Sequence, residues 1–200
     1  MEFPLLGEPL ALDLVNTRPL GVDLLATPES LDDWLRAQAD RLPPLPTPGT
    51  GPRRDAGRGA GSGAEAASGA AELAAVHAVR EAAAQALGAG RLGERPPAEA
   101  LRVLNGALAG APARRELRWD DAGPVAAELR EGSRADRLAA VLAESVAELL
   151  LDPRLGQVRA CEGADCVLLF LPAHPRRRWC VASACGNRAR VARYYQRHKG

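Results

Sequence analysis

Residues 161–188 read CEGADCVLLFLPAHPRRRWCVASACGNR and contain every cysteine of the 200-residue chain. The cysteines form two Cys-x4-Cys pairs, Cys161 with Cys166 and Cys180 with Cys185, and thirteen residues separate the pairs. Two short-range pairs that a hairpin brings together supply the four thiolates that structural zinc takes in a tetrahedral arrangement. The sequence therefore predicts one structural zinc ion on these four side chains, with thiol redox chemistry or cysteines without a shared role as the alternatives.

The residues between and after the cysteine pairs predict a small module with strands and a helix. Residues 167–171 are an apolar run of strand length, residues 172–175 can turn the chain, and residues 176–179 lead back toward the metal. After Gly186 and Asn187, residues 188–198 contain good helix formers and no helix breaker, which favours a final helix. A knuckle, a hairpin and a helix around one zinc form a treble clef, and we expect this module over residues 154–200.

Charge is divided unevenly along the chain. Residues 158–200 hold nine basic and two acidic side chains, a net charge of about +7, whereas the residues before them hold 17 basic and 23 acidic ones. A basic end on an acidic body indicates a polyanionic partner. On a helical wheel of the final helix, Arg190, Arg193 and Arg197 lie within roughly 60° of one another. We expect this stripe to contact nucleic acid, and double-stranded DNA in the first place.

The other basic and aromatic residues of the tail are assigned two roles. Further contacts with nucleic acid are expected from Arg176, Arg178 and Lys199. Support of the module is expected from Trp179, Asn187, Arg188 and Tyr195. Arg188 falls beside Tyr195 on the wheel, away from the basic stripe, so we expect it to pair with Glu162 or Asp165. Trp179 and Tyr195 are expected to form the core of so small a module.

Two other partners fit the same basic face. An acidic protein could bind it, and arginine-rich zinc modules also bind RNA. For DNA, one short helix reads few bases, so useful specificity favours a homodimer.

The first 153 residues predict a body that mixes strands and helices, which makes the whole chain α+β. Leu10, Leu12 and Leu14 alternate with other residues in the period of a half-buried strand. Leu117 and Trp119 alternate in the same way and lead into a turn, which predicts a strand and a hairpin.

Helices are predicted from capping signals and apolar stripes. Thr27–Pro28 is typical of a helix start, and apolar stripes predict helices around residues 73–87, 101–108 and 133–151, of which the last is expected to be the longest. Residues 43–70 contain almost nothing apolar that is larger than alanine or proline, so we expect a flexible insertion there.

Asp13, Asn16 and Thr17 close the first predicted strand and could line a ligand pocket at its end. The same residue types form turns and caps, and this structural interpretation is the one we favour. The sequence shows no Ser/His/Asp set, phosphate loop or paired-carboxylate motif, and its three histidines offer few bases. We therefore expect a protein that is not an enzyme.

The N-terminal residues lack a basic segment and are interrupted by Glu8 and Asp13, which is unlike a signal peptide. The most apolar stretch, residues 138–151, is too short for a bilayer span and contains Glu144 and Glu148. We expect a soluble cytoplasmic protein with no membrane partner. In that reducing compartment, clustered cysteines are more often metal ligands than disulfides.

Several motifs resemble a known family. CGNR at 185–188, preceded by RRWC at 177–180, resembles the CGNR zinc-finger family. GEPLALDLVNT at residues 7–17 is similar to the opening of the ABATE domain that usually precedes that finger. Three later segments of the chain also resemble that domain, namely LN at 104–105, LRWD at 117–120 and LLLDPR at 149–154. The likeness covers nearly the whole chain except the predicted insertion.

The resemblance implies a stress-related transcription regulator. Its α/β body, residues 1–153, would sense a small-molecule effector, and its finger, residues 154–200, would bind DNA. This chain departs from the family in one place, since the turn PAHP at 172–175 is shorter than usual and lacks the acidic residue and the Ser/Thr that commonly stand there.

Overall fold

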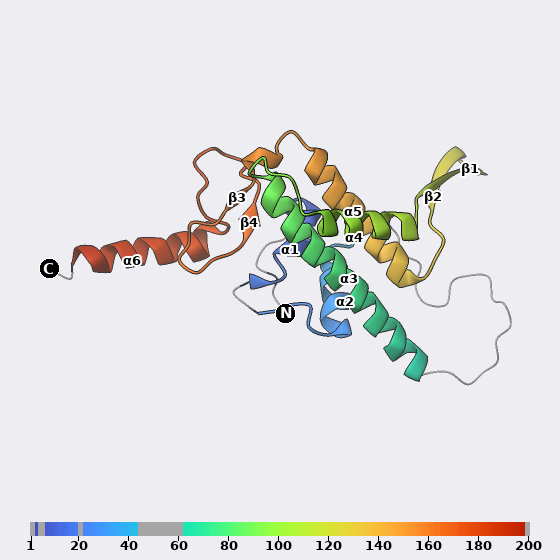
Figure 1. Cartoon of the computed structure of the whole chain (residues 1–200), viewed down its shortest axis with the longest axis horizontal. Helices are drawn as coiled ribbons and strands as arrows, with labels where there is room; N and C mark the ends of the chain where they lie inside the picture. Colours follow the sequence, from blue (N-terminus) through green and yellow to red (C-terminus); the bar gives the residue numbers. More distant parts are fainter. Residues whose placement is uncertain (1–2, 4–6, 20–21, 44–61, 199–200) are drawn as a thin grey trace.

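The computed structural model describes residues 3, 7–19, 22–43 and 62–198 (Figure 1). Its helices are α1 (Leu10–Val15), α2 (Pro28–Ala37), α3 (Ser62–Gly90), α4 (Ala98–Gly110), α5 (Arg134–Leu151) and α6 (Asn187–Arg197). Its strands are β1 (Arg114–Asp120), β2 (Gly123–Leu129), β3 (Arg159–Ala160) and β4 (Leu169–Phe170), and it has two short helices, η2 (Leu155–Gln157) and η3 (Ala182–Gly186). The predicted α+β class is confirmed, with helices in the majority.

The main core lies between α3 and α5, with α4 and α1 packed against them (Figure 1). Val76 and Leu87 of α3, Leu138 and Leu142 of α5 and Trp34 of α2 are fully buried in one apolar cluster. Burial of each such side chain contributes roughly 1.5–3 kcal/mol. The body is therefore held by helix packing.

The prediction of a strand at Leu10–Val15 is wrong, because this segment forms α1. The carbonyl of Pro9 accepts hydrogen bonds from the amides of Leu12 and Asp13 at 2.8 and 3.1 Å and so begins the helix. Residues 11–14 are all buried, because α1 lies against α3, α5 and β4. A helix that is buried on every side has no single apolar face, so alternating leucines carry no information about a strand here.

The insertion predicted for residues 43–70 ends earlier than expected, since α3 begins at Ser62. Residues 44–61 lie outside the described residues. Alanine, the best helix former, dominates the start of α3, and Glu72 pairs with Arg134 of α5. α3 is consequently longer than α5, against the prediction. Within the described ranges, no helix combines the length and the apolar character that a bilayer crossing requires.

The helix start at Thr27 and the hairpin around residues 117–125 are confirmed. The side chains of Thr27 and Ser30 form a capping box at the start of α2. β1 and β2 pair antiparallel over their whole length. At the base of the hairpin, Arg130 bonds to the carboxylates of Glu128 and Glu144, and its side chain is almost fully buried. The hairpin is therefore anchored at its base, while its tip projects from the helices (Figure 1).

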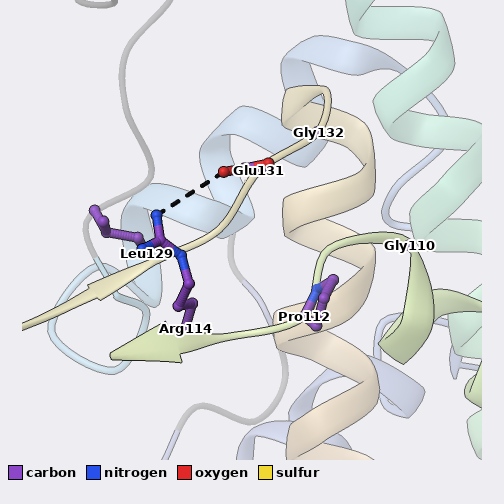
Figure 2. A pocket seen from close by; sticks show the side chains of 6 residues that line it. All are labelled: Gly110, Pro112, Arg114, Leu129, Glu131 and Gly132. Carbon is purple, nitrogen blue, oxygen red and sulfur yellow. Dashed lines mark ion pairs between the residues drawn. The ribbon is translucent and has the colours of Figure 1, made fainter. Parts of the chain in front are cut away.

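A shallow pocket of about 360 Å³ opens where the hairpin leaves the helices. Figure 2 shows its lining residues, which are Gly110, Pro112, Arg114, Leu129, Glu131 and Gly132. Arg114 Nη2 and Glu131 Oε1 lie 3.9 Å apart across its mouth.

Candidate metal centre and basic helix

The two cysteine pairs are delivered by different local structures. Cys161 follows β3, and its amide donates to the carbonyl of Leu168 at 2.9 Å. This residue begins the knuckle, the tight turn of residues 161–166. The knuckle closes at Cys166, whose amide donates to the carbonyl of Gly163 at 3.1 Å. Cys180 ends the long loop, and Cys185 lies in η3 immediately before α6. The backbone thus brings together cysteines of the two pairs, which are 14 to 24 positions apart.

The hairpin differs from the predicted one. β4 pairs with β3, which precedes Cys161, rather than with residues 176–179. Residues 176–179 approach the knuckle through one backbone hydrogen bond, from the amide of Glu162 to the carbonyl of Arg178 at 3.0 Å. Pro172 and Pro175 lie in the connecting turn, and proline lacks the N–H that a paired strand needs.

The geometry of the four thiols fits one zinc ion. All four Sγ atoms lie within 4.8 Å of one another. The Sγ atoms of Cys166 and Cys180 are 3.8 Å apart, and those of Cys180 and Cys185 are 3.5 Å apart. Zinc–sulfur bonds of about 2.3 Å place the corners of a sulfur tetrahedron roughly 3.8 Å apart. The predicted set of four ligands is therefore brought together as one closed site that can bind one zinc ion.

Two backbone amides donate to the sulfur of Cys161 and favour its thiolate form. Burial acts to raise the pKa of Cys161, but the amides of Cys180 and Gly163 donate to its sulfur at 3.3 and 3.4 Å and bring that pKa below its usual value. Burial and the neighbouring thiols raise the pKa of Cys180. Four adjacent thiolates repel one another unless a cation lies between them, so this cluster suits a divalent metal.

Gly163 is required by the close packing of the knuckle. A Cβ atom at this position would lie 3.0 Å from Cys185 Cβ and 3.2 Å from Cys185 Sγ. Asp165 adopts the left-handed conformation, with φ of 59°, which turns the chain toward Cys166. The tight spacing of the first cysteine pair thus depends on a residue without a side chain.

Comparison with known families now assigns both parts of the chain. Residues 8–153 match the ABATE family, which is described as “Putative stress-induced transcription regulator”. The chain belongs to the ABATE family. Residues 157–198 match the CGNR zinc finger, so the predicted arrangement of ABATE domain and CGNR finger is confirmed. These are regulator and zinc-finger families rather than enzyme families. A comparison with curated proteins finds no significant match.

The basic stripe of the CGNR finger lies on α6, which projects away from the ABATE domain (Figure 1). Arg190, Arg193 and Arg197 are exposed. Arg193 Nε and Arg197 Nε donate to the carbonyls of the residues four positions earlier, at 3.1 and 3.3 Å, so their stems lie along the helix. Among the described residues, no carboxylate pairs with any of the three. The helix therefore presents uncompensated positive charge to solvent.

The other predicted nucleic-acid contacts differ in their surroundings. Arg176 is exposed. Arg178 Nε donates to Glu162 Oε2 at 2.6 Å, so its charge is already matched by a carboxylate. Lys199 lies outside the described residues. Of these three, Arg176 has the exposed side chain that most resembles those of the stripe.

The supporting residues also divide. Arg188 Nη2 donates to Cys185 Sγ at 3.0 Å, rather than pairing with Glu162 or Asp165 as expected; Arg188 follows the ligand by three positions, one helical turn, and is thereby held at the sulfur. Trp179 is half-buried and packs on Gly186, where a Cβ atom would lie 3.3 Å from its ring.

The remaining two supporting residues lie at the surface. Asn187 is the exposed first residue of α6. The expectation that Tyr195 forms part of the core is wrong, because its side chain is 62% exposed. Among the described helices and strands, α6 contacts only η3.

Asp13, Asn16 and Thr17 are buried and bond within the protein, although Oδ1 of Asp13 has no hydrogen-bond partner among the described residues. Asp13 Oδ2 accepts from Gly7, Gln38 and Arg41. Thr17 Oγ1 donates to the carbonyl of Leu14 at 2.7 Å. A role of the three in a ligand pocket stays a prediction.

Asn16 joins the ABATE domain to the CGNR finger. Its Nδ2 donates to the carbonyl of Leu169, and its Oδ1 accepts from the amide of Leu169, both at 2.8 Å. Glu8 makes the second link, because its Oε2 accepts from the amide of Leu171 at 2.8 Å. Both residues of the ABATE domain therefore hold the backbone of β4 and its continuation.

Arg177 completes this junction and was not predicted to have a role. Its Nη2 lies 2.8 Å from Glu8 Oε1 and 2.7 Å from the carbonyl oxygen of Cys180. Its guanidinium carbon lies 4.4 Å above the centre of the buried Phe170 ring. Strand alternation within RRR at 176–178 sets Arg177 apart from its neighbours, and this was the available signal; its acidic partner is 169 positions away and could not be read from the sequence.

Proposed function

We propose that the chain is a zinc-dependent transcription regulator whose finger, residues 154–200, binds double-stranded DNA through α6, while residues 1–153 form the regulatory body. The observation that carries the proposal is the exposed stripe of Arg190, Arg193 and Arg197, which has no carboxylate partner among the described residues. Uncompensated arginines on one helical face are suited to the phosphates of nucleic acid.

The dimensions of α6 support a duplex as the partner. From Arg190 to Arg197 the helix rises about 10 Å, at roughly 1.5 Å per residue, and the major groove of DNA, about 12 Å wide, admits an α-helix. Tyr194 lies next to the stripe and stacks on His198, with 4.1 Å between ring centres. This aromatic pair lies on the edge of the face that would meet DNA.

The metal centre would fix the direction in which α6 projects. The helix begins two residues after Cys185, and Arg188 in its first turn bonds to the sulfur of that ligand. Zinc with four thiolates carries a net charge of about −2, which attracts a guanidinium group. Cys185 and Arg188 together tie the first turn of α6 to the site.

The salt dependence of binding tests the proposal. If the tail neutralises about four duplex phosphates, the slope of log K against log salt for the full chain should be roughly −3.6. Arg190→Ala, Arg193→Ala and Arg197→Ala should each make the slope shallower by about one unit on any duplex. Arg102→Ala on α4, an exposed arginine of the body paired with Glu99, removes the same charge and should leave the slope unchanged.

Other partners are outcomes of the same experiment. Preference for RNA or for single strands would reassign the nucleic acid. Folded, zinc-loaded protein that binds no nucleic acid at low salt would overturn the proposal and leave an acidic protein as the partner. We place the regulator in the cytoplasm, where reducing conditions keep the thiols available for zinc.

A small-molecule effector is part of this proposal. A pocket of about 400 Å³ lies between α1 and α5, and its lining includes Leu10, Arg41 and Glu148. Arg41 also bonds to the buried carboxylate of Asp13 at 2.5 Å, so a charged ligand that draws Arg41 away would disturb α1. A thermal-shift screen of charged metabolites against the wild type and Arg41→Ala tests this part, because true ligands should stabilise only the wild type.

A further inference from the structure

The β1–β2 hairpin presents an apolar face that no described element covers. Leu117 and Trp119 lie on the same face of β1 and are 76% and 78% exposed. They are paired across the hairpin with Ala126 and Pro124, which are also exposed. Exposed aromatic and aliphatic side chains in one patch are typical of a surface that binds a partner.

The two strands of the hairpin have outer edges of different character. Among the described residues, the sheet contains only β1 and β2, so each strand has one edge without a strand beside it. Pro124 interrupts the edge of β2, because proline has no N–H to donate. β1 contains no proline and reads RRELRWD over Arg114–Asp120. β1 is thus the edge that can accept another strand.

We infer that β1 pairs antiparallel with β1 of a second copy of this chain about a two-fold axis through Leu117, which forms a four-stranded sheet across a homodimer. The charge pattern of β1 carries this inference. In that register Arg114 opposes Asp120 of the second copy, Glu116 opposes Arg118, Arg115 opposes Trp119, and Leu117 opposes itself. Every charged residue of the strand meets an opposite charge or an aromatic ring.

Neighbouring registers lack this complementarity. Pairing centred on Glu116 opposes Glu116 to itself and Arg114 to Arg118, and pairing centred on Arg118 opposes Arg118 to itself and Glu116 to Asp120. Like charges that stand directly opposite destabilise a sheet. Charges at a sheet edge usually prevent pairing with other strands. Here the same charges disfavour the two neighbouring registers and favour the one centred on Leu117.

Within one copy the charges are only partly matched. Arg118 Nε lies 3.0 Å from Glu116 Oε1, and Arg114 lies 3.8 Å from Glu116, with more than half of each arginine side chain exposed. Exposed pairs of this kind contribute little to stability. A strand from a second copy would add cross-strand partners for the same side chains and would lay Leu117 against Leu117.

The hairpin lies at the end of the molecule opposite to α6 (Figure 1). Pairing through β1 would leave both fingers free at the outer ends of the dimer. A two-fold arrangement of two fingers suits two symmetric DNA half-sites. The dimer itself does not require DNA, so the two proposals can fail separately.

Sedimentation of the full zinc-loaded chain tests the dimer. A contact of one strand edge is small, so we expect a dissociation constant on the order of micromolar and measure from roughly 1 to 100 μM. The wild type should shift with concentration from 21.0 kDa toward twice that mass. Glu116→Arg and Arg118→Glu should each weaken the dimer about tenfold or more, because each places like charges opposite one another at two symmetric positions.

A mixture of the two variants provides the decisive comparison. In a heterodimer of Glu116→Arg with Arg118→Glu, every opposed pair again has opposite charges, so the mixture should dimerise as the wild type does. This recovery also shows that both variants are folded. Arg102→Glu on α4 makes the same charge reversal off the hairpin and should not change the mass. A wild type that stays monomeric, variants that dimerise like the wild type, or a mixture that does not recover would each overturn the inference.

Discussion

Arg177 in the zinc finger and Glu8 in the N-terminal body form an ion pair, with 2.8 Å between Nη2 and Oε1, and only 8% of the glutamate side chain is exposed. The same guanidinium covers Phe170 and bonds to the carbonyl of the ligand Cys180. One side chain therefore contacts the body, the small core of the finger and the backbone of the metal site.

Replacing Arg177 should weaken the junction strongly. Arg177→Ala leaves the carboxylate of Glu8 mostly buried without its cation, which costs about 3 kcal/mol in the free energy of unfolding. Urea unfolding of the zinc-loaded protein measures this loss. Arg176→Ala, one position away and exposed, should change stability by less than about 0.5 kcal/mol, and equal losses in the two variants would show that the junction is not formed.

Gly163→Ala should lower zinc affinity. The added methyl group would contact Cβ and Sγ of Cys185 at about 3 Å, so the ligands must move apart, with an expected loss of roughly 10- to 100-fold in affinity. Competition with a chelator measures it. Gly156→Ala in η2 adds the same methyl group where nothing lies within 4 Å and serves as the control. Unchanged affinity in Gly163→Ala would mean that the knuckle is looser than described.

Arg188 and Arg190 lie two positions apart, but their replacement should affect different properties, zinc affinity for Arg188 and DNA binding for Arg190. Arg188→Ala removes the donor to Cys185 Sγ and should lower zinc affinity about tenfold. Arg190→Ala should keep zinc and weaken binding to duplex DNA. Both quantities are measured on both variants. An equal loss of zinc affinity in Arg188→Ala and Arg190→Ala would contradict this separation of roles.

Asp23 should make the stability of the body depend on acid pH. The hydrogen bonds from Arg80, at 2.7 and 2.5 Å, lower the pKa of Asp23 from 3.8 to about 2. Because the folded-state pKa lies below the unfolded one, this contribution is present above about pH 4 and disappears as the pH falls toward 2.

The corresponding variant isolates this effect. At neutral pH, Asp23→Asn should lower the free energy of unfolding by about 2 kcal/mol, and the difference from the wild type should shrink below pH 4. Unfolding by urea at several pH values measures both. A difference that stays constant from pH 7 to pH 2.5 would show that the ion pair does not form.

The sequence predicted those features that depend on local signals. The cysteine spacing specified the four ligands, and Thr27 with Pro28 specified the start of α2, because ligand spacing and capping are read over a few residues. α1 was misread, since its burial on all sides depends on helices far along the chain. The sequence also could not predict the exposure of Tyr195 or the partner of Arg177, because both depend on how the finger packs on the body.

Asn16 has a consequence for how the protein can be divided. Its side-chain amide offers Leu169 one donor and one acceptor, as the peptide groups of a neighbouring strand would, so Asn16, the C-cap of α1, continues the hydrogen bonding of β4 on the edge away from β3. A fragment cut at residue 154 would expose that edge to water and lose its template. The isolated finger would therefore lack a hydrogen-bonding partner of β4, and a movement of α1 would act directly on the backbone of Leu169, three residues after Cys166.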